Sequence, residues 1–322
     1  MNKPVLFIVF NRFDTAQKVF EQIRLAQPPR LYIASDGARE NVENEKAIVE
    51  NIRKWILENV DWDCEVKTLF REKNLGCDIN ISKAISTFFE NETDGIILED
   101  DCLPSQSFFK YCEMALDKYK NDKHIWHIGG SNSKNIHLSD NTDIVYTSKC
   151  MLCWGWATWA DRWKYFNSDL NNYNIQNIRN TFDKISWQIY WLRILYRNNN
   201  NKLKSWDYQW ALNIMEHGGV CLYPCKNLIK NIGFDGTHYR GKKKSKLLSS
   251  QQNFEIENIN LPDKIVYNRK YDDLIFKHFY RIQSFMFKFI LRFFAELVTL
   301  NYNGESSTII RQVIGINKKK RK

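Results

Sequence analysis

The chain of 322 residues has no apolar run long enough to cross a bilayer, and it contains little glycine or proline. A spanning helix needs about 18 consecutive apolar residues with almost no charge, and no such stretch occurs. With only 13 glycines and 6 prolines, collagen-like and low-complexity classes are excluded. The apolar run at residues 4–10 lacks the cleavage site of a signal peptide. We therefore expect a folded, cytoplasmic protein.

Two glycine-rich phosphate motifs are missing as well. The sequence contains neither the G-x-G-x-x-G of dinucleotide-binding folds nor a P-loop. The eight cysteines of a cytoplasmic chain are expected to stay reduced. The pairs Cys150/Cys153 and Cys221/Cys225 leave a four-thiolate zinc site as an alternative to core thiols, although the second spacing is loose.

Short apolar runs alternate with amphipathic segments through the first 130 residues. The composition, 43% hydrophobic with 20 Phe, 15 Tyr and 11 Trp, is sufficient to fill a sizeable core. Helices are expected at about 15–25, 42–58, 77–89 and 105–119, with Asp14 as the N-cap of the first, and strands at 4–10, 31–34, 64–70, 95–98 and 125–128. This order predicts an α/β fold with a mostly parallel sheet flanked by helices.

Three acids follow the predicted strand at 95–98, namely Glu99, Asp100 and Asp101, and Pro104 is expected to close that strand. Grouped carboxylates repel one another and lose solvation, so the pattern favours a site for a cation. Mg²⁺ and Mn²⁺ prefer such oxygens and usually also hold substrate phosphates. Strand alternation puts Glu99 and Asp101 on one face and Asp100 on the other, unless the strand has already ended before them. The alternative is a solvated acidic turn.

Two further polar pairs, Asn11-Arg12 and Asp36-Gly37, follow other predicted strands. The carboxyl ends of parallel strands meet at one edge of a sheet, which is where ligands bind in open α/β folds. The sequence therefore predicts that Arg12, Asp36 and the three acids converge at that edge.

The middle of the chain is less regular. A tryptophan-rich run at 153–163 contains Gly155 and Trp156, and it is either a set of core aromatics or a wall facing a sugar. Trp206-Asp207 opens a predicted helix in which Asp207 is well placed as the N-cap. Residues 231–246, with three glycines and a basic run, indicate either a loop that covers an anionic ligand or an ordinary solvated loop.

The C-terminal part is basic. Residues 226–322 hold 20 Lys and Arg against 8 Asp and Glu, a net charge of +12, and the first 225 residues carry −2. A helix predicted over 272–299 carries a polar, mostly cationic stripe formed by Lys277, Arg281, Ser284, Lys288 and Arg292. Such a helix suits an anionic membrane surface, as does the tail at 318–322. Packing on the domain and a dimer face are the alternatives.

The motifs at the predicted strand ends resemble those of the GT-A (Rossmann-like) glycosyltransferases. The resemblance is to bacterial relatives of the N-acetylglucosaminyltransferase I family, which is inverting and carries a Glu-Asp-Asp motif. It implies that Arg12 contacts the nucleotide diphosphate, although Asn11 departs from the family aspartate. It also implies that Asp36 reads the base.

The resemblance covers roughly residues 3–240 and assigns further roles. In the Glu-Asp-Asp motif the last residue, Asp101, holds the metal, and Glu99 and Asp100 touch the donor sugar and ribose. Gly155-Trp156 resembles the Gly-Trp near the donor sugar. Asp207 resembles the catalytic base, and residues 233–238 resemble a loop that orders on donor binding.

The resemblance implies a glycosyltransferase domain at 1–245 and a C-terminal extension at 246–322. The expected reaction is a Mn²⁺- or Mg²⁺-dependent transfer of sugar from a nucleoside diphosphate, UDP-GlcNAc by family default, to a saccharide hydroxyl. The basic extension suggests the inner membrane face and a lipid-linked acceptor in surface glycan assembly. The rivals are a sugar-nucleotide nucleotidyltransferase and a protein that binds nucleic acid or membrane without catalysis. The near-neutral first part argues against nucleic acid.

Overall fold

The computed structural model describes residues 1–132, 145–233, 252–265, 267 and 269–314, and it divides the chain into two compact units. We call Met1–Phe166 with Val220–Asn268 the sheet unit, and Asn167–Gly219 with Arg269–Lys322 the helical unit. In the described part of the chain, no helix combines the length and hydropathy required to cross a bilayer.

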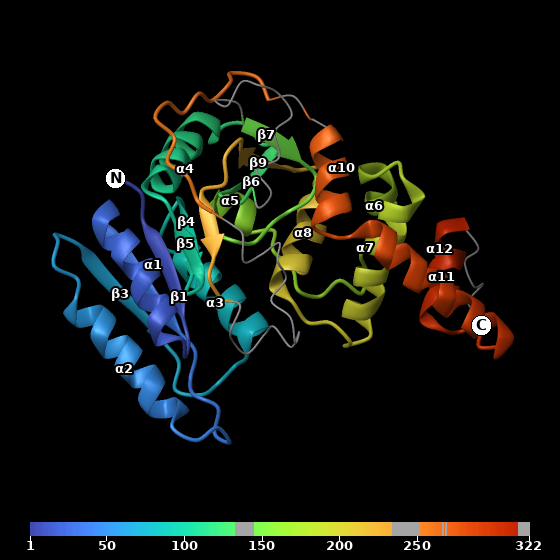
Figure 1. The fold of residues 1–322 in the computed structure, drawn as a ribbon, viewed down its shortest axis with the longest axis horizontal. Helices are drawn as coiled ribbons and strands as arrows, with labels where there is room; N and C mark the ends of the chain where they lie inside the picture. Colours follow the sequence, from blue (N-terminus) through green and yellow to red (C-terminus); the bar gives the residue numbers. More distant parts are fainter. Residues whose placement is uncertain (133–144, 234–251, 266, 268, 315–322) are drawn as a thin grey trace. The chain divides into compact units, whose positions relative to one another are not determined.

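The sheet unit is built on one large sheet (Figure 1). In spatial order its strands are β3 (Glu65–Phe70), β2 (Arg30–Ser35), β1 (Val5–Val9), β4 (Asp94–Glu99), β8 (Trp156–Trp159), β6 (Ile125–Gly129), β9 (Val220–Pro224) and β7 (Val145–Ser148). Only β8 and β7 run antiparallel to their neighbours. The predicted α/β class with a mostly parallel, Rossmann-like GT-A sheet is confirmed.

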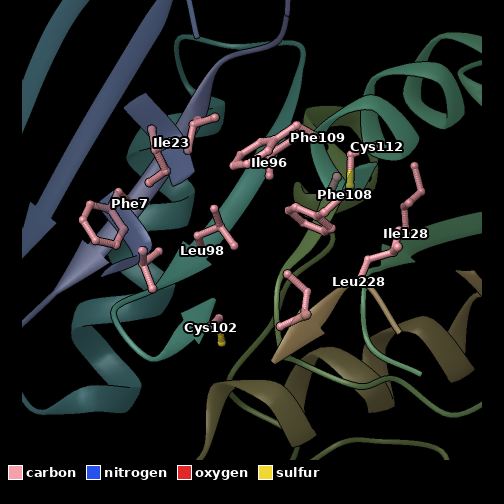
Figure 2. Close-up of a cluster of buried hydrophobic side chains, with 14 of the residues drawn as sticks. Phe7, Ile23, Ile96, Leu98, Cys102, Phe108, Phe109, Cys112, Ile128 and Leu228 are labelled. Atoms are coloured by element: carbon pink, nitrogen blue, oxygen red, sulfur yellow. The ribbon is translucent and has the colours of Figure 1, made fainter. Parts of the chain in front are cut away.

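Helices cover the sheet and close its core. They are α1 (Phe13–Ala26), α2 (Glu45–Glu58), α3 (Cys77–Phe89), α4 (Gln106–Tyr119) and α5 (Ala160–Trp163). All five residues of β1 are buried, as expected for a strand covered on both faces. Figure 2 shows one side of this core, where Phe7 of β1 and Ile23 of α1 belong to the same apolar cluster as Phe108 of α4.

The turn after β4 decides between the two arrangements expected for the acids. The strand ends at Glu99, so Asp100 and Asp101 lie in a turn and strand alternation no longer separates their side chains. Pro104 does not end β4, as was predicted, because that strand has already ended at Glu99. Pro104 is the last residue of β5 (Cys102–Pro104), a short strand that pairs antiparallel with β10 (Ile229–Asn231).

The connection from β1 to α1 is only three residues long, Phe10–Arg12. The helix begins at Phe13 with Arg12 in the N-cap position, so the predicted cap, Asp14, instead lies in the first helical turn. This short link places Arg12 directly at the carboxyl end of β1.

The helical unit contains six described helices. They are α6 (Gln176–Thr181), α7 (Ile185–Asn199), α8 (Trp206–Glu216), α10 (Arg269–His278), α11 (Ile282–Val298) and α12 (Glu305–Ile314). The predicted single helix over 272–299 is therefore two helices. They are separated because Arg281 adopts a left-handed backbone conformation, with φ of 50°.

Aromatic packing explains why the helical unit combines two distant parts of the chain. Trp187 of α7 stacks on Phe276 of α10 with ring centroids 4.0 Å apart, and Phe182 meets the same ring edge-on. Residues 167–219 therefore pack with α10–α12. The predicted division at residue 245 follows the resemblance rather than this packing and stays a prediction.

His127 of β6 is an ionisable side chain buried within the sheet unit. Its Nε2 lies 3.1 Å from the carbonyl oxygen of Leu152, and its ring stacks on Trp156. Burial lowers the pKa of His127 to about 3, and the hydrogen bond to Leu152 only partly opposes this effect. The imidazole is therefore neutral in the folded protein at neutral pH.

We expect acid to destabilise the fold through His127. Below its ordinary pKa of 6.5 the unfolded histidine binds a proton, whereas the folded one does not until about pH 3. The free energy of unfolding should therefore fall as pH drops from 6.5, by about 2 kcal/mol from this residue at pH 5. Urea unfolding at pH 7 and pH 5 measures the loss. In His127→Gln the loss should shrink by that amount, and an identical loss in both proteins would contradict the assignment.

Candidate functional site

The parallel pairing of β1 with β4 brings Arg12 to the acidic turn. Ile8 of β1 is in register with Glu99, the last residue of β4. Nη1 of Arg12 lies 2.7 Å from Oδ2 of Asp101 and 3.5 Å from Oδ1 of Asp100. The predicted convergence of Arg12 with the acids is therefore present in the structure, and both aspartates contact the same guanidinium.

Asp100 is the more deeply placed of the two aspartates. Its Oδ2 accepts a hydrogen bond of 3.1 Å from the backbone N–H of Phe10 at the end of β1. Burial, followed by the charge of Asp101, raises the pKa of Asp100 to about 7, although Arg12 opposes the shift. Asp100 therefore takes up a proton readily near neutral pH, and a bound cation would favour its charged form.

Besides Arg12, two neighbours hold Asp101 in place. Its Oδ1 accepts a hydrogen bond from the thiol of Cys102 at 3.4 Å, and its backbone carbonyl accepts one of 2.8 Å from the N–H of Ile232. Burial raises the pKa of Cys102 well above its ordinary value, so this thiol remains a donor. The Asp101 side chain is 18% exposed, and its carboxylate can therefore still meet a ligand.

Gly233 packs against the Asp101–Arg12 pair. A Cβ atom at Gly233 would overlap the Asp101 carboxylate, coming within 2.7 Å of Asp101 Cβ and 2.8 Å of Arg12 Nη1. Residues 231–232 bring the backbone there, because Asn231 of β10 pairs with Cys102 of β5. A side chain at this position would therefore force Asp101 or Arg12 to move.

The acids fit a divalent cation in their donor chemistry. Burial lowers the pKa of Arg12, but Asp100, Asp101 and Glu99 outweigh this effect and raise it, so all three carboxylates act on one guanidinium. Among the described residues no three His, Cys, Asp or Glu side chains are grouped as a complete metal site. Mg²⁺ usually needs only one or two carboxylates, because water and substrate phosphates complete its shell. Asp101, with Asp100 behind it, meets that requirement.

Asp36 lies at the end of the neighbouring strand β2 and organises the backbone there. Its Oδ1 accepts hydrogen bonds from the N–H groups of Gly37 and Leu75 at 3.0 and 2.9 Å, and its Oδ2 accepts one from Gly76 at 2.9 Å. The side chain is buried and ties the end of β2 to the loop after β3. Reading of a base by Asp36 stays a prediction.

An additional polar cluster beside Arg12 was not found from the sequence. Glu45, at the start of α2, is buried and accepts a hydrogen bond of 2.8 Å from the side-chain amide of Asn11. Arg39 pairs with the same carboxylate, its Nε lying 2.9 Å from Oε2. The cluster fixes the residue before Arg12. Nothing in the sequence connects Glu45 with Asn11, because the two meet only through the fold.

Gly155 and Trp156 are placed by packing. Gly155 has a left-handed φ of 59°, and a Cβ atom there would overlap Ile229. The side chain of Trp156 is 1% exposed and stacks on His127 in the core. This placement matches the alternative of core aromatics, and a contact of either residue with a donor sugar stays a prediction.

Asp207 is the second residue of α8, and the helix N-cap is Ser205 rather than Asp207 as predicted. The hydroxyl of Ser205 donates a hydrogen bond to Oδ1 of Asp207. Asp207 belongs to the helical unit, and its role as a base stays a prediction. Of the predicted donor-ordered loop at 233–238, only Gly233 is described; the rest, the basic run at 240–246 and the tail at 318–322 lie outside the described residues.

The cysteines of the alternative zinc site are mostly in the core. Cys150, Cys221 and Cys225 are buried, and Cys153 is intermediate. None of the eight cysteines forms a disulfide.

Comparison with known proteins gives structural likenesses only. No family model and no curated protein matches the chain. Its fold is similar to a mannosyltransferase from Pyrobaculum calidifontis in complex with GDP-Man and Mn²⁺, with 12% identity, coverage of 49% of this chain and 45% of the other, and a TM-score of 0.32. The chain thus spans under half of that enzyme.

Two other solved structures are similar at the same level. One is a UDP-glucose pyrophosphorylase complexed with UDP-glucose, with 12% identity, coverage of 70% and 90%, and a TM-score of 0.36. The other is mouse xyloside xylosyltransferase 1, with 9% identity, coverage of 65% and 80%, and a TM-score of 0.32. At these TM-scores no match assigns a function to this chain.

Proposed function

We propose that the chain is a metal-dependent, inverting glycosyltransferase that moves a sugar from a nucleoside diphosphate to a saccharide hydroxyl. One observation carries the proposal, namely the cluster of Arg12, Asp100 and Asp101 where β1 and β4 end. A guanidinium and partly buried carboxylates at the carboxyl edge of a parallel sheet suit a ligand that brings a metal ion together with a diphosphate.

Each residue of the cluster has a role in donor binding. Arg12 binds the diphosphate, since a guanidinium presents several donors to phosphate oxygens. Asp101 would hold the cation, which when bound would neutralise the diphosphate leaving group, and Asp100 would touch the donor together with Glu99. Cys102 orients the Asp101 carboxylate through the thiol hydrogen bond. Asp36 holds the loop after β3 through its hydrogen bonds from Leu75 and Gly76, beside the expected position of the nucleotide base.

The acceptor must lose a proton as the new glycosidic bond forms. We assign that proton to the carboxylate of Asp207, whose first-turn position in α8 and hydrogen bond from Ser205 hold it in one conformation. The assignment comes from the resemblance of Trp206-Asp207 to the family motif. The donor is UDP-GlcNAc by family default.

A nucleotidyltransferase that makes sugar nucleotides is the second candidate. Such an enzyme normally carries a glycine-rich loop with a Lys or Arg after its first strand. Here only Phe10–Arg12 separates β1 from α1, and none of the three is glycine. That short connection favours transfer from a finished sugar nucleotide over its synthesis.

A thermal-shift panel of nucleotide sugars, with and without Mn²⁺, tests the proposal. A matching donor should raise the melting temperature only with metal present, because binding to the folded state alone stabilises it by mass action. A UDP-sugar that also yields free sugar by slow hydrolysis points to the transferase. Stabilisation by a nucleoside triphosphate together with a sugar 1-phosphate, and release of pyrophosphate, would instead support the nucleotidyltransferase. A panel with no metal-dependent shift would contradict both.

A further inference from the structure

Helix α11 exposes a continuous apolar face. Six large side chains spaced three or four residues apart lie on that face, and each is exposed: Phe287, Ile290, Leu291, Phe294, Leu297 and Val298. We call this set the α11 apolar face. Side chains at this spacing share one side of a helix. Single exposed apolar residues are common, whereas a contiguous set of this size marks an interaction surface.

The opposite side of α11 is the one that packs within its own unit. Phe289 and Glu296 are its buried residues, and they lie across the helix from Phe287, Leu291 and Phe294. The Glu296 carboxylate accepts hydrogen bonds from the N–H groups of Ser306 and Ser307 at the start of α12, at 3.1 and 2.7 Å. Internal packing therefore fixes which side of α11 faces outward.

The charge around the α11 apolar face is cationic. Lys288 of α11 and Arg281 just before it are exposed. Glu296 is the only acid of α11, and it is turned inward to α12 and to Arg292, whose Nε lies 3.2 Å away. An exposed apolar face flanked by Lys and Arg without acids suits an anionic lipid surface.

A second copy of the chain fits this face less well. It would bring the same cations, Arg281 and Lys288, against those of the first copy, and like charges that meet across an interface oppose association. At 17 residues α11 is about 25 Å long, which suits a helix lying in the plane of a bilayer surface.

We propose that the chain docks on anionic membrane surfaces through the α11 apolar face, with Lys288 and Arg281 meeting the lipid headgroups. The helix lies along the interface and does not span the bilayer. The inference is independent of the glycosyltransferase proposal, because it uses no residue of the Arg12 cluster.

Flotation of the full chain with lipid vesicles tests the proposal. Vesicles of phosphatidylcholine with about 30% phosphatidylglycerol should bind the protein, and pure phosphatidylcholine should bind much less. The triple variant Phe287→Gln, Leu291→Gln, Phe294→Gln should lose roughly tenfold or more in partitioning, because three apolar anchors are removed. The variant Lys288→Glu should lower binding to the anionic vesicles by about fivefold or more.

Leu25→Gln is the matched control, since Leu25 of α1 is 66% exposed, as is Phe287. Its vesicle binding should equal that of the wild-type protein. Unchanged binding by the triple variant, or equal binding to both vesicle types, would overturn the proposal. The proposal would also be overturned if the wild-type protein did not bind vesicles but formed a dimer in light scattering, and the triple variant did not. That result would assign the face to a second copy of the chain. No arm uses a sugar nucleotide, so failure here leaves the proposed enzyme function unaffected.

Discussion

Replacing Asp101 by alanine should abolish metal-dependent binding of the donor nucleotide sugar. The Asp101 carboxylate contacts Arg12 at 2.7 Å and is the carboxylate of the turn nearest to that guanidinium. In the proposed site the cation would then lose its protein ligand, and Arg12 would be left with Asp100 alone. Truncating one partner of such a charged contact costs about 2–5 kcal/mol, so donor affinity with Mn²⁺ should fall by roughly 30-fold or more. Calorimetric titration of UDP-sugar with and without Mn²⁺ measures the loss.

The control for Asp101→Ala is Asp14→Ala. Asp14 lies two residues after Arg12, in the first turn of α1, and is exposed. Its removal changes the local charge equally but takes no ligand from the site, so donor affinity should stay within about twofold, a change of under 0.5 kcal/mol. Donor binding by Asp101→Ala with the wild-type Mn²⁺ dependence would exclude the metal assignment. A far-UV spectrum like that of the wild-type protein ensures that a loss reports the site and not the fold.

The convergence of Arg12 with Asp100 and Asp101 could be predicted because parallel strands deliver their carboxyl ends to one edge. That rule needs only the order of strands and helices, which apolar periodicity indicates. The strands of the first half confirm it: residues 4–10 were predicted for β1, and the structure has Val5–Val9. Asp36 reached the expected strand end for the same reason.

The contacts that shape the site could not be predicted, since they join segments far apart in the sequence. Gly233 meets Asp101 only because β10 pairs with β5, a strand too short to show a periodic pattern. Glu45 meets Asn11 through the loop before α2. The residue type alone also does not predict whether a side chain is buried or lies on a binding surface. Trp156 is in the core, although tryptophan is also common on binding surfaces.

The helical unit was the least predictable region. The sequence predicts one helix over residues 272–299, because the spacing of apolar and cationic residues continues unchanged through the break at Arg281. Helical periodicity carries no signal for the left-handed backbone of Arg281 or for the contact of α10 with α7, where Trp187 stacks on Phe276. The contacts of Glu296 with the start of α12, which join residues about ten apart, decide which side of α11 faces outward.

Replacing Asp207 by asparagine should abolish transfer and leave donor binding intact. Asparagine keeps the shape of the side chain and can still accept a hydrogen bond from Ser205, but it cannot take the acceptor proton. A positioned base typically contributes about 10²- to 10⁴-fold to the rate, so turnover should fall by that factor. Single-turnover transfer from a radiolabelled donor measures the rate, and calorimetry measures donor affinity.

The competing role of Asp207 is to stabilise α8 as a first-turn acid, which is worth about 0.3–1 kcal/mol of stability. If this were its whole role, Asp207→Asn would lower the free energy of unfolding slightly and turn over at the wild-type rate. Asp14→Asn, which removes a first-turn acid from α1, calibrates that stability loss. A rate defect in Asp207→Asn well beyond the Asp14→Asn effect, at equal donor affinity, assigns the proton to Asp207. If Asp207→Asn lost only stability and turned over at the wild-type rate, Asp207 would not be the catalytic base, because transfer would proceed without its carboxylate.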